Sequence, residues 1–469
     1  MTRETINRRR FLKAAGLGAV SLALPRRLDA AGAPRGKPNV VFILIDDQRW
    51  DVMSCAGHTY VKSPNLDRLA REGAMFTRAF VTTSLCSPSR ASFLTGRYAH
   101  GHGVPTNAGR DPDPRWPTFP ALLRTAGYET AFVGKWHMAG HNRPRPGFDH
   151  WVSFRGQGNY TRNMLNVNGE TVESKKYVTD DLSDRAVEWL RRKPTRPFML
   201  YLSHKAVHAN FTPAPRHADL YADVEMALNT REDDRLDTKV RWGRYFPETT
   251  WQKDLRRYMQ ALRAVDEGVG KVLDTLDSLG LADTTMVVFT SDNGYFHGEH
   301  RLWDKRAAYE PSIRIPMLVR YPPLVRPGTR IDALVLNIDL APTLLDLAGA
   351  EAPETMQGRS WLPLARGDTA AGWRTSFLYE YFREGDPRFN RPSVLAVRTA
   401  RYKYITYPDR EEAPVELYDL QTDPEELTNL APDPRHKETL ARLAAELERQ
   451  KKATGFRLPG KGNRQGRGT

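Results

Sequence analysis

The most reactive side chain in this sequence is that of Cys86. The residues from Cys86 to Leu94 predict a helix, and Cys86 stands at its start. A cysteine in that place lies beside free backbone N–H groups and the positive end of the helix dipole. Both lower the pKa of a thiol, and both favour a bound anion. The residues alone therefore predict a nucleophile next to an anion-binding helix end.

Acidic or amide side chains directly follow two predicted strands. They are Asp46-Asp47, after residues 39–45, and Asp292-Asn293, after residues 285–290. Either pair alone also fits an ordinary strand-to-turn boundary. Three carboxylates and one amide oxygen together are ligands that suit a hard divalent cation, Ca²⁺ or Mg²⁺.

The elements that must position these side chains follow a regular order. Four apolar runs end in polar residues, at 39–45, 129–133, 197–202 and 285–290. Runs of this kind are typical of strands buried on both faces, as in parallel sheets. Helical patterns accompany them, at 63–73, 180–192, 252–279 and 340–348. The alternation predicts an α/β fold with a large, mostly parallel, doubly wound sheet, whose strand ends gather the polar side chains.

Beyond about residue 370 the pattern changes to short strands and one helix. The strands are predicted at 377–382, 393–398, 401–407 and 416–420, and the helix at 436–451. This predicts a smaller C-terminal α+β subdomain with an antiparallel sheet. The expected organisation is a catalytic α/β domain over 37–370, this subdomain over 371–450, and a disordered basic tail over 451–469.

Residues 1–33 predict a targeting segment. The stretch Arg8 to Lys13 resembles the twin-arginine export signal, and the apolar run that follows is too short to span a membrane. We therefore expect twin-arginine export to the periplasm or beyond, with no stable membrane span. A bridge between Cys55 and Cys86, the only cysteines, would remove the nucleophile, but two cysteines do not make a disulfide scaffold.

A longer motif around Cys86 resembles the signature of a known protein family. Cys86-Ser87-Pro88-Ser89-Arg90, followed by Ala91-Ser92-Phe93-Leu94-Thr95-Gly96-Arg97, resembles the signature of the type I sulfatases, of the alkaline-phosphatase-like superfamily. The resemblance implies that Cys86 becomes Cα-formylglycine, whose hydrate attacks sulfur, and that Arg90 holds this hydrate. It also implies that Asp46, Asp47, Asp292 and Asn293, with the modified Cys86, hold Ca²⁺ rather than Mg²⁺.

Three further blocks extend the resemblance. Gly134-Lys135-Trp136-His137 is similar to the family's G-K-W-H element, which implies that Lys135 contacts sulfate and that His137 is a base. The block 203–208 implies that His208 contacts the leaving oxygen, although Val207 stands where proline is common. The block 291–316 implies a sulfate-binding and leaving-group role for Lys305, with His300 lining the substrate pocket.

The substrate signals are weaker. The segment 160–170 looks similar to N-acetylglucosamine-6-sulfatases, which implies a sulfated sugar or glycosaminoglycan. Trp151, Phe154, Tyr160 and Arg155 would form either a sugar-binding wall or an ordinary packed hairpin. Arg383, Arg388 and Arg391 in the C-terminal subdomain would reach the same site.

Two alternatives stay open. One is a phosphodiesterase or phosphonate monoester hydrolase of the same superfamily, and the other is a non-catalytic polyanion-binding protein. The net charge of +14 suits polyanions but suits solubility equally, and we expect no nucleic-acid partner. Because twin-arginine export carries folded proteins, a formylglycine-generating enzyme must act on Cys86 before export.

Overall fold

The protein is described here from a computed structural model. The structure describes residues 36–226, 231–239, 248–369, 371–385, 391–410 and 412–459. The predicted export signal, Arg388 and the final part of the predicted tail lie outside these residues. Within them, no helix has the length and apolar character needed to cross a membrane.

One large mixed sheet organises the described chain. Its central strands are parallel to one another, and antiparallel strands flank them on both sides. In spatial order the strands are β14 (Thr329–Ile331), β2 (Ala74–Phe76), β13 (Met317–Arg320), β9 (Thr285–Ser291), β1 (Asn39–Ile45), β8 (Phe198–Ser203), β4 (Glu129–Lys135), β5 (His150–Phe154), β6 (Asn163–Val167) and β7 (Glu170–Ser174). The predicted α/β fold class is confirmed.

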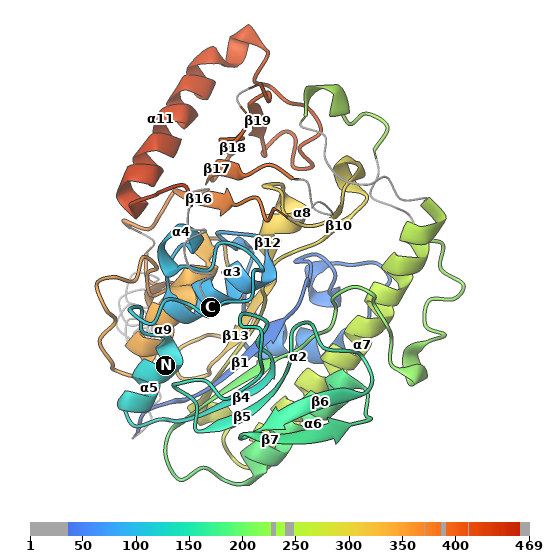
Figure 1. Cartoon of the computed structure of the whole chain (residues 1–469), viewed down its shortest axis with the longest axis vertical. Helices are drawn as coiled ribbons and strands as arrows, with labels where there is room; N and C mark the ends of the chain where they lie inside the picture. The colour runs from blue at the N-terminus through green and yellow to red at the C-terminus, as the bar shows by residue number, and fades with distance from the viewer. Residues whose placement is uncertain are drawn as a thin grey trace, which may run out of the picture. The chain divides into compact units, whose positions relative to one another are not determined.

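Helices cover both faces of this sheet because both faces of its central strands are apolar. Along β1, Val41 and Ile43 belong to one hydrophobic cluster, while Val40 and Phe42 belong to another. Figure 1 shows the two helical layers on opposite sides of the strands. The first cluster includes α2 (Pro64–Glu72), α6 (Val178–Arg191) and α7 (Glu248–Ser278); the second includes α3 (Cys86–Thr95), α5 (Phe119–Thr125), α9 (Leu340–Leu347) and α10 (Leu362–Arg366).

Short elements join this core to a second sheet. They are α4 (Ala99–His102), α8 (Glu310–Ile313), the three-stranded sheet of β12 (Arg314–Ile315), β3 (Ala79–Phe80) and β15 (Val335–Leu336), and the pair β10 (Phe296–His297) and β11 (Trp303–Asp304).

The C-terminal part is the predicted four-stranded antiparallel sheet with one helix against it (Figure 1). Its elements are β16 (Ser376–Tyr381), β17 (Val394–Thr399), β18 (Tyr402–Thr406), β19 (Glu416–Asp419) and α11 (Lys437–Thr454). Buried Leu443 and Leu447 of α11 join the apolar side chains of the sheet in one cluster. The backbone N–H of Glu380 donates to the carbonyl of Thr82 at 2.9 Å, so β16 is tied directly to the segment before Cys86.

The start of the predicted tail is wrong. Residues 451–454 complete α11, and the helix ends at Gly455, which caps it in the left-handed conformation with φ of 65°. Phe456 then packs against His100 and Phe382. A glycine cap and an aromatic anchor order a stretch whose basic composition had suggested disorder. The predicted domain boundaries remain predictions; the residues from Gly36 onward form one compact unit.

Candidate active site

The site lies at the carboxyl ends of the central parallel strands. In the register of the sheet, Ile45 of β1 pairs with Ser291 of β9, and Leu44 pairs with Ser203 of β8. Asp46 and Asp292 therefore leave neighbouring strands at the same edge. Lys135 ends β4 on the other side of β8. The fold thus brings together residues that are 246 positions apart, as the strand-end argument predicted.

Two of the turns after these strands bend in a conformation that is unusual for residues other than glycine. Asp47 has φ of 61° and His137 has φ of 60°. Left-handed backbone at non-glycine residues is uncommon and occurs often at functional sites, where the surrounding structure enforces it. The carbonyl of His137 accepts a hydrogen bond from Ser87 Oγ at 2.6 Å, which ties this turn to α3.

Cys86 is the first residue of α3, as predicted, and its side chain is fully buried. Its Sγ atom lies 3.5 Å from Oδ1 of Asp46, and Lys305 Nζ lies 3.3 Å from the same sulfur. Both cysteines are free thiols, so the Cys55–Cys86 bridge does not form.

The prediction that helix placement lowers the pKa of the Cys86 thiol is wrong. Burial raises the pKa of Cys86 to about 12, despite the opposing charges of Lys135 and Lys305. Desolvation disfavours the thiolate more strongly than the nearby cations favour it. An unconverted Cys86 is therefore a protonated thiol at neutral pH and a poor nucleophile.

A divalent cation fits the carboxylates beside Cys86. Oxygen atoms of Asp46, Asp47 and Asp292 lie within 4.8 Å of one another, and all three side chains are buried. Oδ2 of Asp47 and Oδ1 of Asn293 have no hydrogen-bond partner within the described part of the chain. Buried oxygens without partners are costly, and hard oxygen donors are what Ca²⁺ or Mg²⁺ binds. Four of the five residues predicted as metal ligands are thus brought together, and the fifth, Cys86, lies beside Asp46.

The pKa values of these three carboxyl groups also favour a bound cation. Burial, followed by the charge of Asp46, raises the pKa of Asp292 to about 7. Burial also raises the pKa of Asp47, although Lys305 opposes the shift. Burial alone would raise the pKa of Asp46 as well, but Lys135 and other cations hold it well below its usual value. Additional positive charge would stabilise all three as carboxylates.

Arg90 is fixed within the site by four hydrogen bonds and ion pairs. Its Nε and Nη2 atoms each lie 2.9 Å from Oδ2 of Asp292. Its Nη1 atom donates to the carbonyl of Lys135 at 2.7 Å and to Ser203 Oγ at 2.8 Å. Arg90 thereby links α3 to the ends of β4, β8 and β9, which holds Cys86 against the carboxylates.

Two lysines complete the cationic side of the site. Nζ of Lys135 contacts Asp46 and the side-chain oxygen of Gln157, and Nζ of Lys305 contacts Asp47. Both lysines are buried. Although burial opposes it, the charge of Asp47 raises the pKa of Lys305 well above its usual value, so this lysine is a permanent cation.

The two predicted histidines remain neutral at physiological pH. Burial and the charge of Lys135 hold the pKa of His137 well below its usual value, and burial does the same for His208 despite Asp46. His208 Nε2 lies 3.9 Å from Oδ2 of Asp47, and its Nδ1 lies 2.6 Å from the carbonyl of Ala209. Neutral imidazoles of this kind can accept protons. His204 is buried beside α7 and neither ring nitrogen has a hydrogen-bond partner among the described residues.

His300 is not brought to Cys86. Its Nδ1 atom lies 3.0 Å from Asp234 Oδ2 and 2.9 Å from Lys239 Nζ, and its ring lies 4.2 Å from that of Tyr309. His300 lines a separate cavity of about 510 Å³, and none of the residues around Cys86 lines that cavity. The expectation that His300 lines the substrate pocket is therefore not supported.

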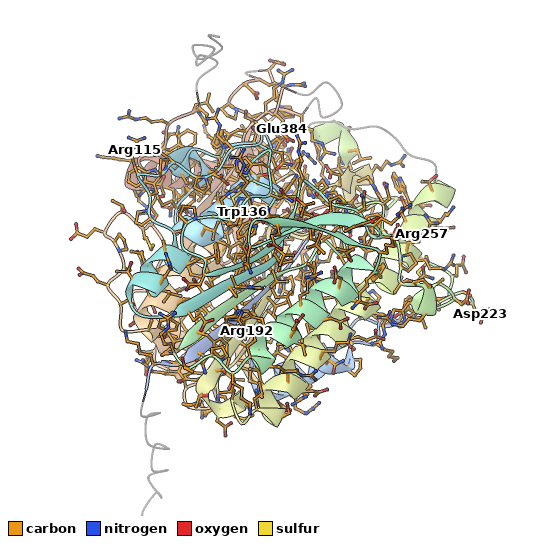
Figure 2. The ribbon with its side chains drawn as sticks, turned by 60° about the horizontal axis from the view of Figure 1, so that its bottom comes forward. Arg115, Trp136, Arg192, Asp223, Arg257 and Glu384 are labelled. Atoms are coloured by element: carbon orange, nitrogen blue, oxygen red, sulfur yellow. The ribbon has the colours of Figure 1, made fainter. Side chains whose placement is uncertain are left out.

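The proposed aromatic sugar wall is also wrong, and the packed alternative holds. Trp151, Phe154 and Tyr160 are all buried. The Trp151 ring stacks on Phe132 with centroids 4.7 Å apart. Trp136 of the G-K-W-H element, labelled in Figure 2, belongs to the same hydrophobic cluster as Trp151 and Phe132. Its indole N–H donates to Asp111 at 2.7 Å. Arg155 alone of the proposed wall is exposed.

Sequence reasoning missed three residues that shape the site, Gln157, Ser203 and Lys205, and it gave Arg391 a different role. Gln157 contacts Lys135, Ser203 binds Arg90, and the carbonyls of Lys305 and Trp303 accept hydrogen bonds from Arg391, which is buried rather than free to reach substrate. Lys205 is buried beside Tyr160. Burial, followed by the charge of Lys135, lowers the pKa of Lys205 to about 8. The block 203–208 contained the signal for Lys205, since a lysine directly follows a buried strand there.

Comparisons with known proteins agree with this geometry. The sulfatase family model matches residues 38–350, and the model of the N-sulphoglucosamine sulphohydrolase C-terminal region matches residues 298–453. The N-acetylglucosamine-6-O-sulfatase of Bacteroides thetaiotaomicron is 33% identical, with 94% of this chain and 91% of that protein covered. The human N-acetylglucosamine-6-sulfatase is 32% identical, with 86% and 82% covered.

A solved structure extends the likeness to the fold of most of the chain. The structure of BT4656 in complex with its substrate D-glucosamine-2-N,6-O-disulfate superposes with a TM-score of 0.82 at 29% identity. The match covers 89% of this chain and 98% of that one. With the family model matched over most of its length and relatives above 30% identity over nearly all of it, this chain belongs to the sulfatase family of sulfuric ester hydrolases.

Proposed function

We propose that this protein hydrolyses the 6-O-sulfate ester of a glucosamine-type sugar through formylglycine at position 86 and a bound Ca²⁺. Sulfatase action on sulfated sugars follows from the relatives, several of which are N-acetylglucosamine-6-sulfatases. The observation that carries the finer proposal is the meeting of Cys86 at the start of α3 with three carboxylates, Arg90 and two buried lysines.

The side chains around Cys86 divide into two groups by role. Asp46, Asp47, Asp292 and Asn293 would hold the cation, which supplies positive charge to sulfate oxygens. Formylglycine at position 86 would supply an oxygen nucleophile for sulfur. Arg90, through its ties to Asp292 and Ser203, keeps position 86 in place at the helix end.

The remaining residues bind sulfate and move protons. Lys135 and Lys305 would bind the non-bridging oxygens and stabilise charge as it develops during transfer. His137, whose buried Nδ1 atom has no hydrogen-bond partner among the described residues, would accept a proton from the group at position 86. His208, whose Nε2 atom lies 3.9 Å from Oδ2 of Asp47, would contact the leaving oxygen.

The test is direct. The protein is co-expressed with a formylglycine-generating enzyme. Sulfate release is measured from N-acetylglucosamine-6-sulfate and from its 3-sulfate isomer, and ester hydrolysis is measured for matched phosphate and phosphonate monoesters. We expect the 6-sulfate to give the highest kcat/KM. A higher kcat/KM for the phosphate or phosphonate esters would instead support the hypothesis of a phosphonate monoester hydrolase.

We further propose that the chain is exported by the twin-arginine translocase after conversion of Cys86. The support is the Arg8-Arg9 motif in the sequence. Fractionation of cells that express the full chain, compared with an Arg8→Lys, Arg9→Lys variant, tests this. Wild-type protein should appear in the periplasm or medium, and the variant should stay in the cytoplasm.

A further inference from the structure

Lys205 is a buried cation without an anionic partner. It lies between β8 and His208, and only 4% of its surface is exposed. Within the part of the chain that the structure describes, its Nζ atom forms no ion pair and no hydrogen bond, and it lies 4.8 Å from the centroid of the Tyr160 ring. Lysines are almost never this buried unless they are paired. A bound anion would supply the partner that Lys205 lacks among the described residues.

The backbone on either side ties Lys205 to the site around Cys86. The N–H of Asp46 donates to the carbonyl of Ala206 at 3.1 Å, and the N–H of Val207 donates to the carbonyl of Asp46 at 2.8 Å. The phenol of Tyr160 donates to the carbonyl of His208 at 2.6 Å, so the ring that faces Lys205 also holds that histidine. Lys205 therefore belongs to the same constellation as the cation site and the leaving-group histidine.

The charges explain what Lys205 is free to bind. Arg90, Lys135 and Lys305 each contact a carboxylate of the site, and Lys205 contacts none. The site thus holds one more cation than carboxylates, before any bound metal is counted. A scissile sulfate monoester carries a single negative charge, and Lys135 and Lys305 are the lysines proposed above to bind it. Lys205 is left to interact with a different negative group.

We propose that Lys205 binds a second anionic group of the substrate, a sulfate or a carboxylate, close to the scissile sulfate ester. This inference rests on the sulfatase function proposed above and narrows its substrate class to sugars that carry at least two anionic groups. The ammonium is fixed by its burial and by the Tyr160 ring, so it selects such a sugar without the entropy cost of ordering a flexible surface lysine.

The experiment compares two substrates in four enzymes. The substrates are D-glucosamine-2-N,6-O-disulfate and N-acetylglucosamine-6-sulfate, which lacks the second charge. The enzymes are the wild type, Lys205→Met, Lys205→Arg, and the control Lys176→Met, which changes an exposed lysine paired with Asp184. We expect the wild type to prefer the disulfated sugar in kcat/KM by about 10- to 100-fold, the usual effect of one charged hydrogen bond.

In Lys205→Met this preference should shrink toward unity, mainly through KM. Lys205→Arg should keep most of it, and Lys176→Met all of it. A 6-sulfated disaccharide with a uronate neighbour then distinguishes a carboxylate from a second sulfate as the preferred anion. Equal losses on both substrates in Lys205→Met would overturn the inference, because Lys205 would then act on the scissile group. Thermal unfolding verifies that the variants fold. If Lys205→Met does not fold, Lys205→Gln replaces it.

A binding measurement separates this inference from the proposed function. Calorimetry on Cys86→Ala gives the Kd of the disulfated sugar without turnover. Adding Lys205→Met should weaken that Kd by about 10- to 100-fold. If the active enzyme cleaves no sulfated sugar, the proposed function fails while this Kd still reports on Lys205. If the Kd is the same with and without Lys205, the second-anion site is refuted whatever the enzyme cleaves.

Discussion

Nζ of Lys305 lies 3.3 Å from Sγ of Cys86, although the two residues are 219 positions apart in the chain. Lys305 stands between Asp304 and Arg306, which have φ of 84° and 80°. Arg391, from the segment before β17, donates to the carbonyls of Lys305 and Trp303 and holds this loop in place. The C-terminal sheet thus helps to position a charge beside the predicted nucleophile.

Replacing Lys305 should slow the chemical step. Lys305→Met removes a buried cation beside the reacting group, and loss of one such stabilising group commonly costs about 10²- to 10³-fold in kcat. We expect kcat for a 6-sulfated sugar to fall by that amount, with a smaller change in KM, in steady-state assays with Lys176→Met as the control. A variant that changes KM alone would show that Lys305 only binds the ground state.

Removing divalent cations should inactivate and destabilise the protein. Without a cation, Oδ2 of Asp47 and Oδ1 of Asn293 have no hydrogen-bond partner among the described residues, so the folded state loses stability when the ion leaves. EGTA should abolish sulfate release, and Ca²⁺ should restore it. Ca²⁺ at about 100 times its Kd should add about 2.7 kcal/mol of unfolding free energy, seen as a rise in Tm.

Asp47→Asn is the matched variant for this prediction because it keeps the side-chain volume. It should lose the Tm response to Ca²⁺. Full activity in EGTA, together with a Tm that ignores Ca²⁺, would contradict the cation site.

The contact between His100 and Glu380 should make stability depend on pH. His100 Nδ1 lies 2.7 Å from Glu380 on β16, and its Nε2 lies 3.0 Å from the carbonyl of Thr454 at the end of α11. Burial lowers the pKa of His100, but the hydrogen bond and charge of Glu380 raise it more, so its net pKa lies above the ordinary 6.5.

A raised folded pKa means that the folded state favours the protonated form. The stabilisation is therefore fully present below about pH 6.5 and is lost as the pH rises through the folded pKa. Urea unfolding of the wild type and His100→Gln at several pH values checks this. The difference in unfolding free energy should be largest at low pH and should shrink above neutrality. A pH-independent difference would mean that His100 stays neutral in the folded protein.

Much of the fold was predictable because it rests on local patterns. The run 39–45 is β1 at the predicted bounds, and α3 begins at Cys86. The strand-end rule then brought Asp46 and Asp292 together without knowledge of the sheet order. The motif positions of Lys135 and Lys305 supplied the cations.

The failures all depend on packing that a sequence does not display. The thiol pKa of Cys86 depends on complete desolvation, which outweighs the helix end and two lysines. Trp151 and Tyr160 have side chains that suit a sugar as well as a core, and only the fold shows that they are buried. Phe456 orders the residues after α11 by contacts with His100 and Phe382, distant in sequence.

The central claim is that converted Cys86 is the nucleophile, and peptide mass spectrometry of active protein tests it most directly. Protein co-expressed with a formylglycine-generating enzyme is digested, and the peptide with Cys86 is measured alongside sulfate release. The account predicts the mass loss that accompanies replacement of CH₂–SH by an aldehyde, in proportion to activity, and a drop of at least about 10³-fold in kcat for Cys86→Ala. Full activity in protein whose Cys86 is entirely an unmodified thiol would contradict it.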